Sequence, residues 1–321
     1  MVDFINISKL FGLEKSIAQE CDTDKNGKLE NDEISIFNQK MDNIKNYSKQ
    51  MDKSKSIYTT ARDATYYAAP ADVQLMRLED AKKAKQFKEE QLHHEKVCSV
   101  IEREAKKRGV NIKPELVEYW ATISESIGKQ YNVPEELLLS IVAQESNGKF
   151  NQHVNAPSGA GPMQITTISI KDFFPNKNNG WTNIFKQMNP KLLDDILYTT
   201  KNGKKVLKYK SPEELRNACG NDDELGLKVG LLVFEMKYVK AVAEKKYGKA
   251  TYANIPKVIT SLQKEEIKYS ETENKKIVKE ALENYNSVPK IKEKYAKNVI
   301  DSLTTSKFIF RDLKLIPKIK T

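Results

Sequence analysis

The sequence predicts a mainly α-helical protein, and three observations support this. Apolar residues recur at helical spacing along most of the chain. The 321 residues include only 13 Gly and 11 Pro, which argues against a turn-dense β-sandwich, a collagen or a low-complexity chain. The longest apolar runs, such as Leu137–Leu139 and Leu231–Phe234, are far shorter than the roughly 20 residues of a membrane span. We therefore expect helices in one large domain or two small ones, with no transmembrane segment.

The chain divides by composition into four stretches. Residues 1–55 hold two amphipathic segments around a polar loop, and residues 56–111 hold a linker and a long charged helix from Val73 to Gly109. Residues 112–305 have the pattern of a globular helical domain, and residues 306–321 are expected to form a basic C-terminal tail. The helices predicted in the domain are Pro114–Gln130, Pro134–Ser146, Leu225–Tyr247, Ile255–Ile267, Glu271–Asn286 and Lys290–Ser302.

A less regular section lies between Ile165 and Asp222, and it contains one strand signal. Asn202-Gly203 stands between two β-prone runs, Ile196–Thr200 and Val206–Tyr209. Asn-Gly suits the positive φ angles of a tight turn, so these residues predict a small β-hairpin inserted in the helical domain.

Residues 22–33 fit the twelve-residue loop of an EF-hand. Glycine at the sixth position allows the left-handed turn, and Leu29 at the eighth is expected to point into a core. The expected calcium ligands are Asp22, Asp24, Asn26, Lys28 through its carbonyl, and Glu33 through both carboxylate oxygens, with Glu30 able to act through a water. No second loop is visible, which favours a structural Ca²⁺ site. An acidic surface turn without a metal is the alternative.

Glu145 continues the apolar stripe of Leu137, Leu138, Ile141 and Val142 at helical spacing. A carboxyl at the end of such a stripe is expected at the edge of a core. Partial loss of water there would raise its pKa toward that of a general acid. Alone, this pattern also fits a solvated residue in a last helical turn.

Two further motifs follow Glu145-Ser146. The first is the stretch Ser158 to Gln164, a small-residue loop that ends in Met163-Gln164. The second is Tyr285-Asn286, at the end of a later predicted helix. Together the three motifs, in this order over about residues 125–305, resemble the soluble lytic transglycosylase domain. The resemblance departs from the family pattern at Pro162, where the family has leucine, and at Val288, where it has glycine.

The resemblance implies a goose-lysozyme-like helical fold and a peptidoglycan substrate. It makes Glu145 the sole catalytic acid and base, with Ser146, Met163, Gln164, Tyr285 and Asn286 lining the sugar subsites. Cleavage between N-acetylmuramic acid and N-acetylglucosamine would form a 1,6-anhydro ring without water, and catalysis would need no cofactor. No Asp or Glu occurs between Ser146 and Lys171, which favours a route with a single carboxylate. A muramidase of the same fold and a weakly catalytic wall-binding module stay open as alternatives.

Partners and location are less constrained by the sequence. The chain carries 54 Lys and Arg against 44 Asp and Glu, a net charge of +10, with pI near 9.1 and a mean hydropathy of −0.63. Lysine and glutamate interleave, so the charge is diffuse and nucleic acid is not an expected partner. The proposed substrate places the activity in the periplasm or outside the cell. No signal peptide is visible, so a phage particle or a specialised secretion route would fit. The oligomeric state is open.

The remaining chemistry-bearing residues give weaker signals. Cys21, Cys98 and Cys219 lack C-x-x-C spacing, so we expect three isolated packing thiols rather than a disulfide or metal framework. His93 and His94 are neighbours on a helix and do not form an i,i+4 metal pair.

Overall fold

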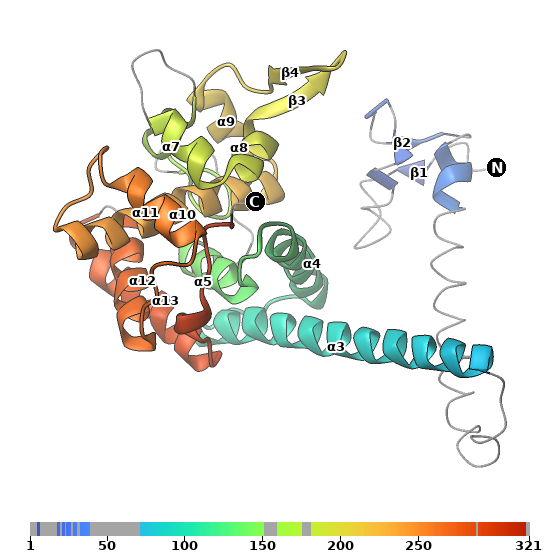
Figure 1. Cartoon of the computed structure of the whole chain (residues 1–321). Coiled ribbons are helices and arrows are strands. Elements are labelled where there is room, and N and C mark those ends of the chain that lie inside the picture. Colours follow the sequence, from blue (N-terminus) through green and yellow to red (C-terminus); the bar gives the residue numbers. More distant parts are fainter. Residues whose placement is uncertain are drawn as a thin grey trace. The chain divides into compact units, whose positions relative to one another are not determined.

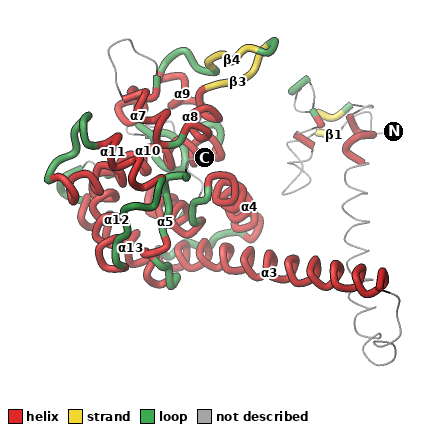
Figure 2. The backbone as a smooth tube through the Cα atoms, viewed as in Figure 1, coloured by secondary structure: helices red, strands yellow, loops and turns green. Residues whose placement is uncertain are grey.

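The computed structural model describes residues 5–6, 18–19, 21–22, 24–26, 28–30, 33–38, 71–150, 159–174, 181–286 and 288–318. These residues are mainly helical, with two short two-stranded sheets (Figure 2). The chain separates into two compact units, Met1–His93 and His94–Thr321, which are described separately. Among the helices described, none has the length and apolar character needed to cross a bilayer.

The first unit has a small core beneath the predicted calcium loop. Strand β1 (Ile5–Asn6) pairs antiparallel with β2 (Lys28–Leu29), with Ile5 opposite Leu29. Leu29 is fully buried, as expected for the eighth loop position, in a cluster with Ala18, Cys21 and Phe37. Residues 18–19, 21 and 33–38 are helical, and the remaining residues of both predicted flanking helices lie outside the described residues.

The predicted long charged helix is α3 (Ala71–Lys107). It ends where Gly109 takes a φ of +71° and the N–H of Val110 donates to the carbonyl of Ala105 at 2.9 Å, a Schellman-type closure. Among the side chains described, residues 82–93 are exposed and the apolar stripe is buried from Val97 onward. Leu92, expected on the stripe, is 55% exposed because this part of the helix has no apolar partner among the described residues.

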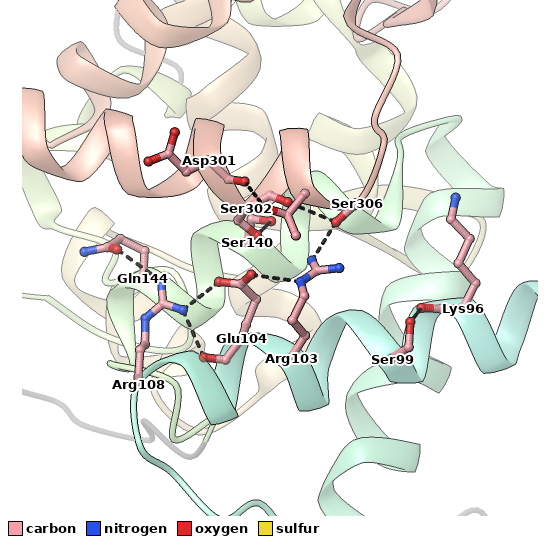
Figure 3. A network of polar contacts seen from close by, with 11 residues as sticks. Lys96, Ser99, Arg103, Glu104, Arg108, Ser140, Gln144, Asp301, Ser302 and Ser306 are labelled. Carbon is pink, nitrogen blue, oxygen red and sulfur yellow. Dashed lines mark hydrogen bonds and ion pairs between the residues drawn. The ribbon is translucent and has the colours of Figure 1, made fainter.

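A buried ion pair lies at the end of α3, and hydrogen bonds from neighbouring arginines connect it to the rest of the second unit (Figure 3). Glu104 is 1% exposed and accepts a hydrogen bond from Nη1 of Arg108 at 2.6 Å. Arg108 also donates to Gln144 at 3.2 Å, and Arg103 donates to Ser306 at 2.6 Å. Burial alone would raise the pKa of Glu104, but the hydrogen bond from Arg108 lowers it below its ordinary value. Glu104 therefore stays ionised and contributes to stability until the pH falls below the range of an ordinary carboxylate.

The six helices predicted in the domain are all present, within a few residues at their ends. They are α4 (Pro114–Tyr131), α5 (Glu135–Glu145), α10 (Asp223–Tyr247), α11 (Ile255–Gln263), α12 (Glu271–Tyr285) and α13 (Lys292–Thr305). Helix α10 is buried on most sides, as its nearly continuous apolar run requires (Figure 1). It contacts α4, α11 and α12, and also α8 (Pro190–Leu197) and α9 (Pro212–Cys219). Helix α13 packs against both α5 and α12.

The section from Ile165 to Asp222 is more regular than the sequence indicated. It contains α6 (Thr167–Ile170), a 3₁₀ turn η2 (Lys171–Phe173), α7 (Trp181–Met188), α8 (Pro190–Leu197), β3 (Tyr198–Lys201), β4 (Lys204–Leu207) and α9 (Pro212–Cys219). The predicted hairpin is present, with φ angles of 50° at Asn202 and 72° at Gly203 in its turn. Its first strand begins at Tyr198 instead of Ile196, because Ile196 is fully buried as part of α8.

The C-terminal residues differ from the expected basic tail. A 3₁₀ turn η3 (Phe310–Asp312) follows α13, and Phe310, Leu315 and Ile316 are buried in the main core. The carboxylate of Glu271 accepts the N–H groups of Phe310 at 2.9 Å and of Arg311 at 2.8 Å. The apolar residues between the lysines thus fix this segment on the N-terminus of α12 as far as residue 318, the last one described.

Candidate active site

Glu145 is the last residue of α5, and its carboxyl group is largely removed from water. The stripe that leads to it is buried, with Leu137, Ile141 and Val142 fully covered. Burial raises the pKa of Glu145 to about 7, and a hydrogen bond from Tyr295 opposes that rise only in part. A carboxyl with this pKa is half protonated at neutral pH, so it can both donate and accept a proton.

Two tyrosines stand beside this carboxyl. The hydroxyl of Tyr295, on α13, donates to Oε1 of Glu145 at 2.7 Å. The ring of Tyr285, at the end of α12, stacks on that of Tyr295 with centroids 6.5 Å apart and planes 17° apart. Burial and the charge of Glu145 raise the pKa of both tyrosines well above the usual value of 10. Both hydroxyls therefore remain protonated donors.

The small-residue loop is a tight, internally bonded turn. Ala160 and Ile165 exchange both backbone hydrogen bonds, at 2.9 and 2.8 Å, and Gln164 donates its N–H to Gly161 at 3.1 Å. Gly161 has a φ of +69°, and a Cβ there would lie 2.2 Å from the carbonyl oxygen of Cys219. Glycine is required here both by backbone conformation and by the close approach of α9.

Two glycines of α10 allow this loop to pack closely against the helix. A Cβ at Gly226 would lie 2.6 Å from Pro162, and a Cβ at Gly230 would lie 2.3 Å from the sulfur of Met163. Met163 is fully buried, and its carbonyl accepts the hydroxyl of Tyr285 at 2.9 Å. The loop is thus held between α10 and Tyr285, and Tyr285 connects it to Tyr295 and Glu145.

The structure divides the site residues predicted from the sequence into two groups. Glu145, Tyr285 and the backbone of Met163 come together, whereas the side chain of Met163 packs on α10 instead of facing a ligand. Ser146 is fully buried, and its hydroxyl accepts the N–H of Phe150 at 3.1 Å. We therefore correct the expectation that the side chains of Ser146 and Met163 line the sugar subsites. The reason is that both are enclosed by the core.

Gln164 and Asn286 are half-buried and differ from that enclosed pair. The amide of Gln164 donates to the carbonyl of Gly161 at 3.0 Å, and the amide oxygen of Asn286 accepts the N–H of Val288 at 3.1 Å. Each side chain has further hydrogen-bonding capacity beyond that one local contact. Unlike the side chains of Ser146 and Met163, these two are partly exposed.

Sequence reasoning missed Tyr295 and a second buried acid, Glu235. Tyr295 lies 150 residues from Glu145, so no local pattern connects the two. Glu235 is fully buried on α10 and accepts the amide of Asn189 at 2.9 and 3.2 Å. The burial of Glu235 could have been predicted, because it is a single charged residue within an apolar run that ends at Met236. Burial raises the pKa of Glu145 and the hydrogen bond from Tyr295 lowers it, and the charge of Glu235 is not among the causes of the shift.

The predicted calcium loop brings three carboxylates together in the first unit. Asp22, Asp24 and Glu33 each place an oxygen within 4.8 Å of the others. The backbone N–H of Asn26 donates to Asp22 at 3.1 Å and to Asp24 at 3.1 Å, and the side-chain oxygen of Asn26 accepts the N–H of Lys28 at 2.8 Å. This curled arrangement of oxygen ligands suits a hard divalent cation. Within this loop, Thr23, Gly27 and residues 31–32 lie outside the described residues.

Comparison of the chain with models of protein families, with curated proteins and with solved structures gave no match. Any functional assignment therefore depends on the residues and their geometry. At the end of α5 the geometry offers Glu145 as a proton-transfer group of near-neutral pKa, with two tyrosine donors and a backbone loop held against them.

Replacing Tyr295 by Phe is expected to raise the pKa of Glu145 further above 7. The hydroxyl stabilises the ionised carboxylate, so its loss favours the protonated form by roughly 1.5 kcal/mol, or about one pH unit. Carbon NMR of the labelled glutamate carboxyls, recorded against pH, measures this directly. Tyr238→Phe is the matched control, because the buried hydroxyl of Tyr238 donates to Asn274 instead. An unchanged titration of Glu145 in Tyr295→Phe would contradict the geometry.

Proposed function

We propose that the second unit is a peptidoglycan lytic transglycosylase in which Glu145 serves as the general acid and then as the base. The observation that carries this proposal is the Glu145 carboxyl, with its pKa of about 7 and its hydrogen bond to Tyr295. The order of the motifs at Glu145, Met163-Gln164 and Tyr285-Asn286 supports the same assignment. Peptidoglycan lies outside the cytoplasm, so the proposal also places the activity at the cell envelope.

In the proposed reaction, protonated Glu145 donates its proton to the glycosidic oxygen between N-acetylmuramic acid and N-acetylglucosamine. The N-acetyl group of the substrate can stabilise the oxocarbenium-like centre, so no second protein carboxylate is needed. Glu145, now ionised, removes the proton of the C6 hydroxyl of the muramic sugar. The resulting oxygen closes the 1,6-anhydro ring, and the proton returns the enzyme to its starting state.

Tyr295 and Tyr285 act as positioning residues in this proposal. The hydroxyl of Tyr295 fixes the orientation of the carboxyl and stabilises its ionised form, which is the base in the second half of the reaction. Tyr285 fixes the carbonyl of Met163 and thereby the loop that carries Gln164. We assign sugar contacts to the amides of Gln164 and Asn286, because those side chains are not enclosed.

Mass analysis of digested peptidoglycan tests the proposal and its alternatives. A lytic transglycosylase releases anhydro-muropeptides, each lighter by one water than the product of a muramidase. Products that carry the full water would replace the lyase with a muramidase of the same site. Intact glycan that nevertheless sediments with the protein would favour the wall-binding module.

We also propose that the loop at residues 22–33 binds Ca²⁺ as a structural clip. The support is the convergence of Asp22, Asp24 and Glu33 and the burial of Leu29 beside β1. Asp22→Ala or Glu33→Ala is expected to remove the calcium-dependent rise in melting temperature. If the site binds with a Kd of about 0.1 mM, 10 mM Ca²⁺ stabilises the wild type by about 2.7 kcal/mol.

Differential scanning calorimetry with calcium and with a chelator measures that effect. Glu90→Ala provides the control, because it removes an exposed carboxylate from α3, outside the loop. A calcium response that is the same in Asp22→Ala and in the wild type would exclude the loop as the binding site.

A further inference from the structure

A mixed cluster of nitrogen, sulfur and oxygen donors lies where α3 enters the second unit. His94 and Cys98 are one turn apart on α3, and Glu118 faces them from α4. Nε2 of His94 lies 2.8 Å from Oε2 of Glu118 and 3.6 Å from Sγ of Cys98. That sulfur lies 4.0 Å from Oε1 of Glu118. One atom from each side chain thus falls within 4.8 Å of the others.

We propose that His94 Nε2, Cys98 Sγ and the Glu118 carboxylate bind a zinc-class divalent cation, with a solvent molecule as the fourth ligand. Imidazole, thiolate and carboxylate are the three ligand types that zinc uses, and their combination does not suit Ca²⁺ or Mg²⁺. This site is separate from Glu145 and from the calcium loop.

The spacing of the donors agrees with tetrahedral coordination. With metal bonds of about 2.3 Å to sulfur and about 2.05 Å to nitrogen, two ligands at a tetrahedral angle stand about 3.6 Å apart. The distance between Cys98 Sγ and His94 Nε2 is 3.6 Å. The Glu118 oxygens lie 2.8 Å from that nitrogen and 4.0 Å from the sulfur. Tetrahedral coordination would place one Glu118 oxygen about 3.4 Å from the nitrogen and about 3.6 Å from the sulfur. This exposed side chain would therefore have to move by about half an ångström.

Glu125 supplies the outer contact that a zinc-binding histidine requires. Its two carboxylate oxygens each lie 3.0 Å from Nδ1 of His94. With the Nδ1 proton donated to Glu125, the lone pair on Nε2 is directed at Cys98 and Glu118. Carboxylates commonly orient metal-bound histidines in this way. Glu118 is 63% exposed and His94 31% exposed, so an ion can enter from solvent.

An ion pair of protonated His94 with Glu118 and Glu125 is the competing explanation. It accounts for both histidine contacts, whereas the metal site also gives a role to the sulfur of Cys98, which lies 3.6 Å from the same nitrogen and 4.0 Å from Glu118. Burial and, to a smaller extent, the neighbouring carboxylates raise the pKa of Cys98 to about 11. Binding of the cation must therefore release the thiol proton, and any proton on Nε2, to solvent.

Cobalt and zinc titrations of the full-length protein test the proposal. With Ca²⁺ present throughout, we expect one equivalent of Co²⁺ to give a thiolate-to-cobalt absorption band in the near ultraviolet. Calorimetry should give a matching single site for Zn²⁺. Cys98→Ser should abolish the band, and His94→Ala and Glu118→Gln should each weaken zinc binding at least 100-fold. Glu125→Gln should weaken it about 10- to 100-fold.

Two control variants test whether zinc binds at this cluster and not elsewhere. His93→Ala removes the adjacent histidine of the same helix, and Asp22→Ala removes the calcium loop as a competing site; both should bind zinc as the wild type does. The absence of a single site in the wild type would overturn the proposal. So would a band that persists in Cys98→Ser, or wild-type affinity in Glu118→Gln, whose exposed position makes it safe for folding.

Discussion

Glu145→Gln is expected to abolish glycan cleavage, lowering kcat by about 10³-fold or more, while glycan binding survives. Acid and base catalysis each contribute roughly 10²- to 10⁴-fold, and in the proposed reaction one side chain performs both. Glutamine keeps the size of the side chain and a hydrogen-bond acceptor for Tyr295 but cannot transfer a proton. Release of muropeptides, together with sedimentation of the protein with intact sacculi, measures cleavage and binding separately.

Glu235→Gln is the matched control for this variant. Glu235 is also a buried carboxyl with a raised pKa, and it contacts Asn189 instead of the proposed site. It should retain cleavage wherever the protein stays folded. Equal activity of Glu145→Gln and the wild type would remove Glu145 from the reaction and end the proposed mechanism.

Glu145→Gln should also change the free energy of unfolding, by an amount that depends on pH. The pKa of Glu145 rises from the ordinary 4.5 to about 7 on folding, so the folded state binds a proton that the unfolded state has already lost. Wild-type stability therefore falls as the pH rises from about 4.5 to about 7. Glu145→Gln is expected to match the wild type at pH 4 and to be more stable at pH 8, by at most about 3 kcal/mol. Unfolding in urea at both pH values measures this, and it shows independently that the inactive variant is folded.

The sequence predicted the helices that are long enough to show a periodic pattern of apolar residues. The long periodic segments at α4, α5, α10, α12 and α13 gave correct helices, because a buried stripe imposes its spacing on the sequence. Glu145 was identifiable because it extends such a stripe.

Short helices between Ile165 and Asp222 were missed because each is only about two turns long or less. Their starts were nevertheless marked: Asn189 and Ser211 cap α8 and α9, and a proline follows each cap. Such start signals identify a helix that is too short to show a period.

Contacts between distant segments could not be derived from the sequence. Tyr295 reaches Glu145 across 150 residues, and Cys98 meets Glu118 from another helix, so neither pair has a sequence spacing that identifies it. The side chain of Met163 was assigned to a sugar subsite from its motif alone. Its burial depends on the absence of a Cβ at Gly230, 67 positions later, and that relation exists only in the packed fold.

Gly161→Ala is expected to destabilise the protein by about 3 to 5 kcal/mol and to remove cleavage. An alanine at a φ of +69° is strained by about 1 to 2 kcal/mol, and its Cβ would also lie 2.2 Å from the carbonyl oxygen of Cys219. Relief of that contact requires the backbone of the loop or of α9 to move. Because Met163 in this loop accepts the hydroxyl of Tyr285, whose ring stacks on Tyr295, a displaced loop changes the surroundings of the Glu145 carboxyl.

Gly203→Ala is the matched control for Gly161→Ala, because it introduces the same backbone strain without a steric contact. Gly203, in the hairpin turn, has a φ of +72° but nothing within 4 Å of its Cβ position. Its substitution should cost only the shared strain, about 1 to 2 kcal/mol, and should leave cleavage near the wild-type level. The difference in the free energy of unfolding between the two variants, measured in urea, isolates the contact with Cys219. Equal losses would mean that the loop is not pressed against α9, and the positioning of Tyr285 through Met163 would then lack its structural basis.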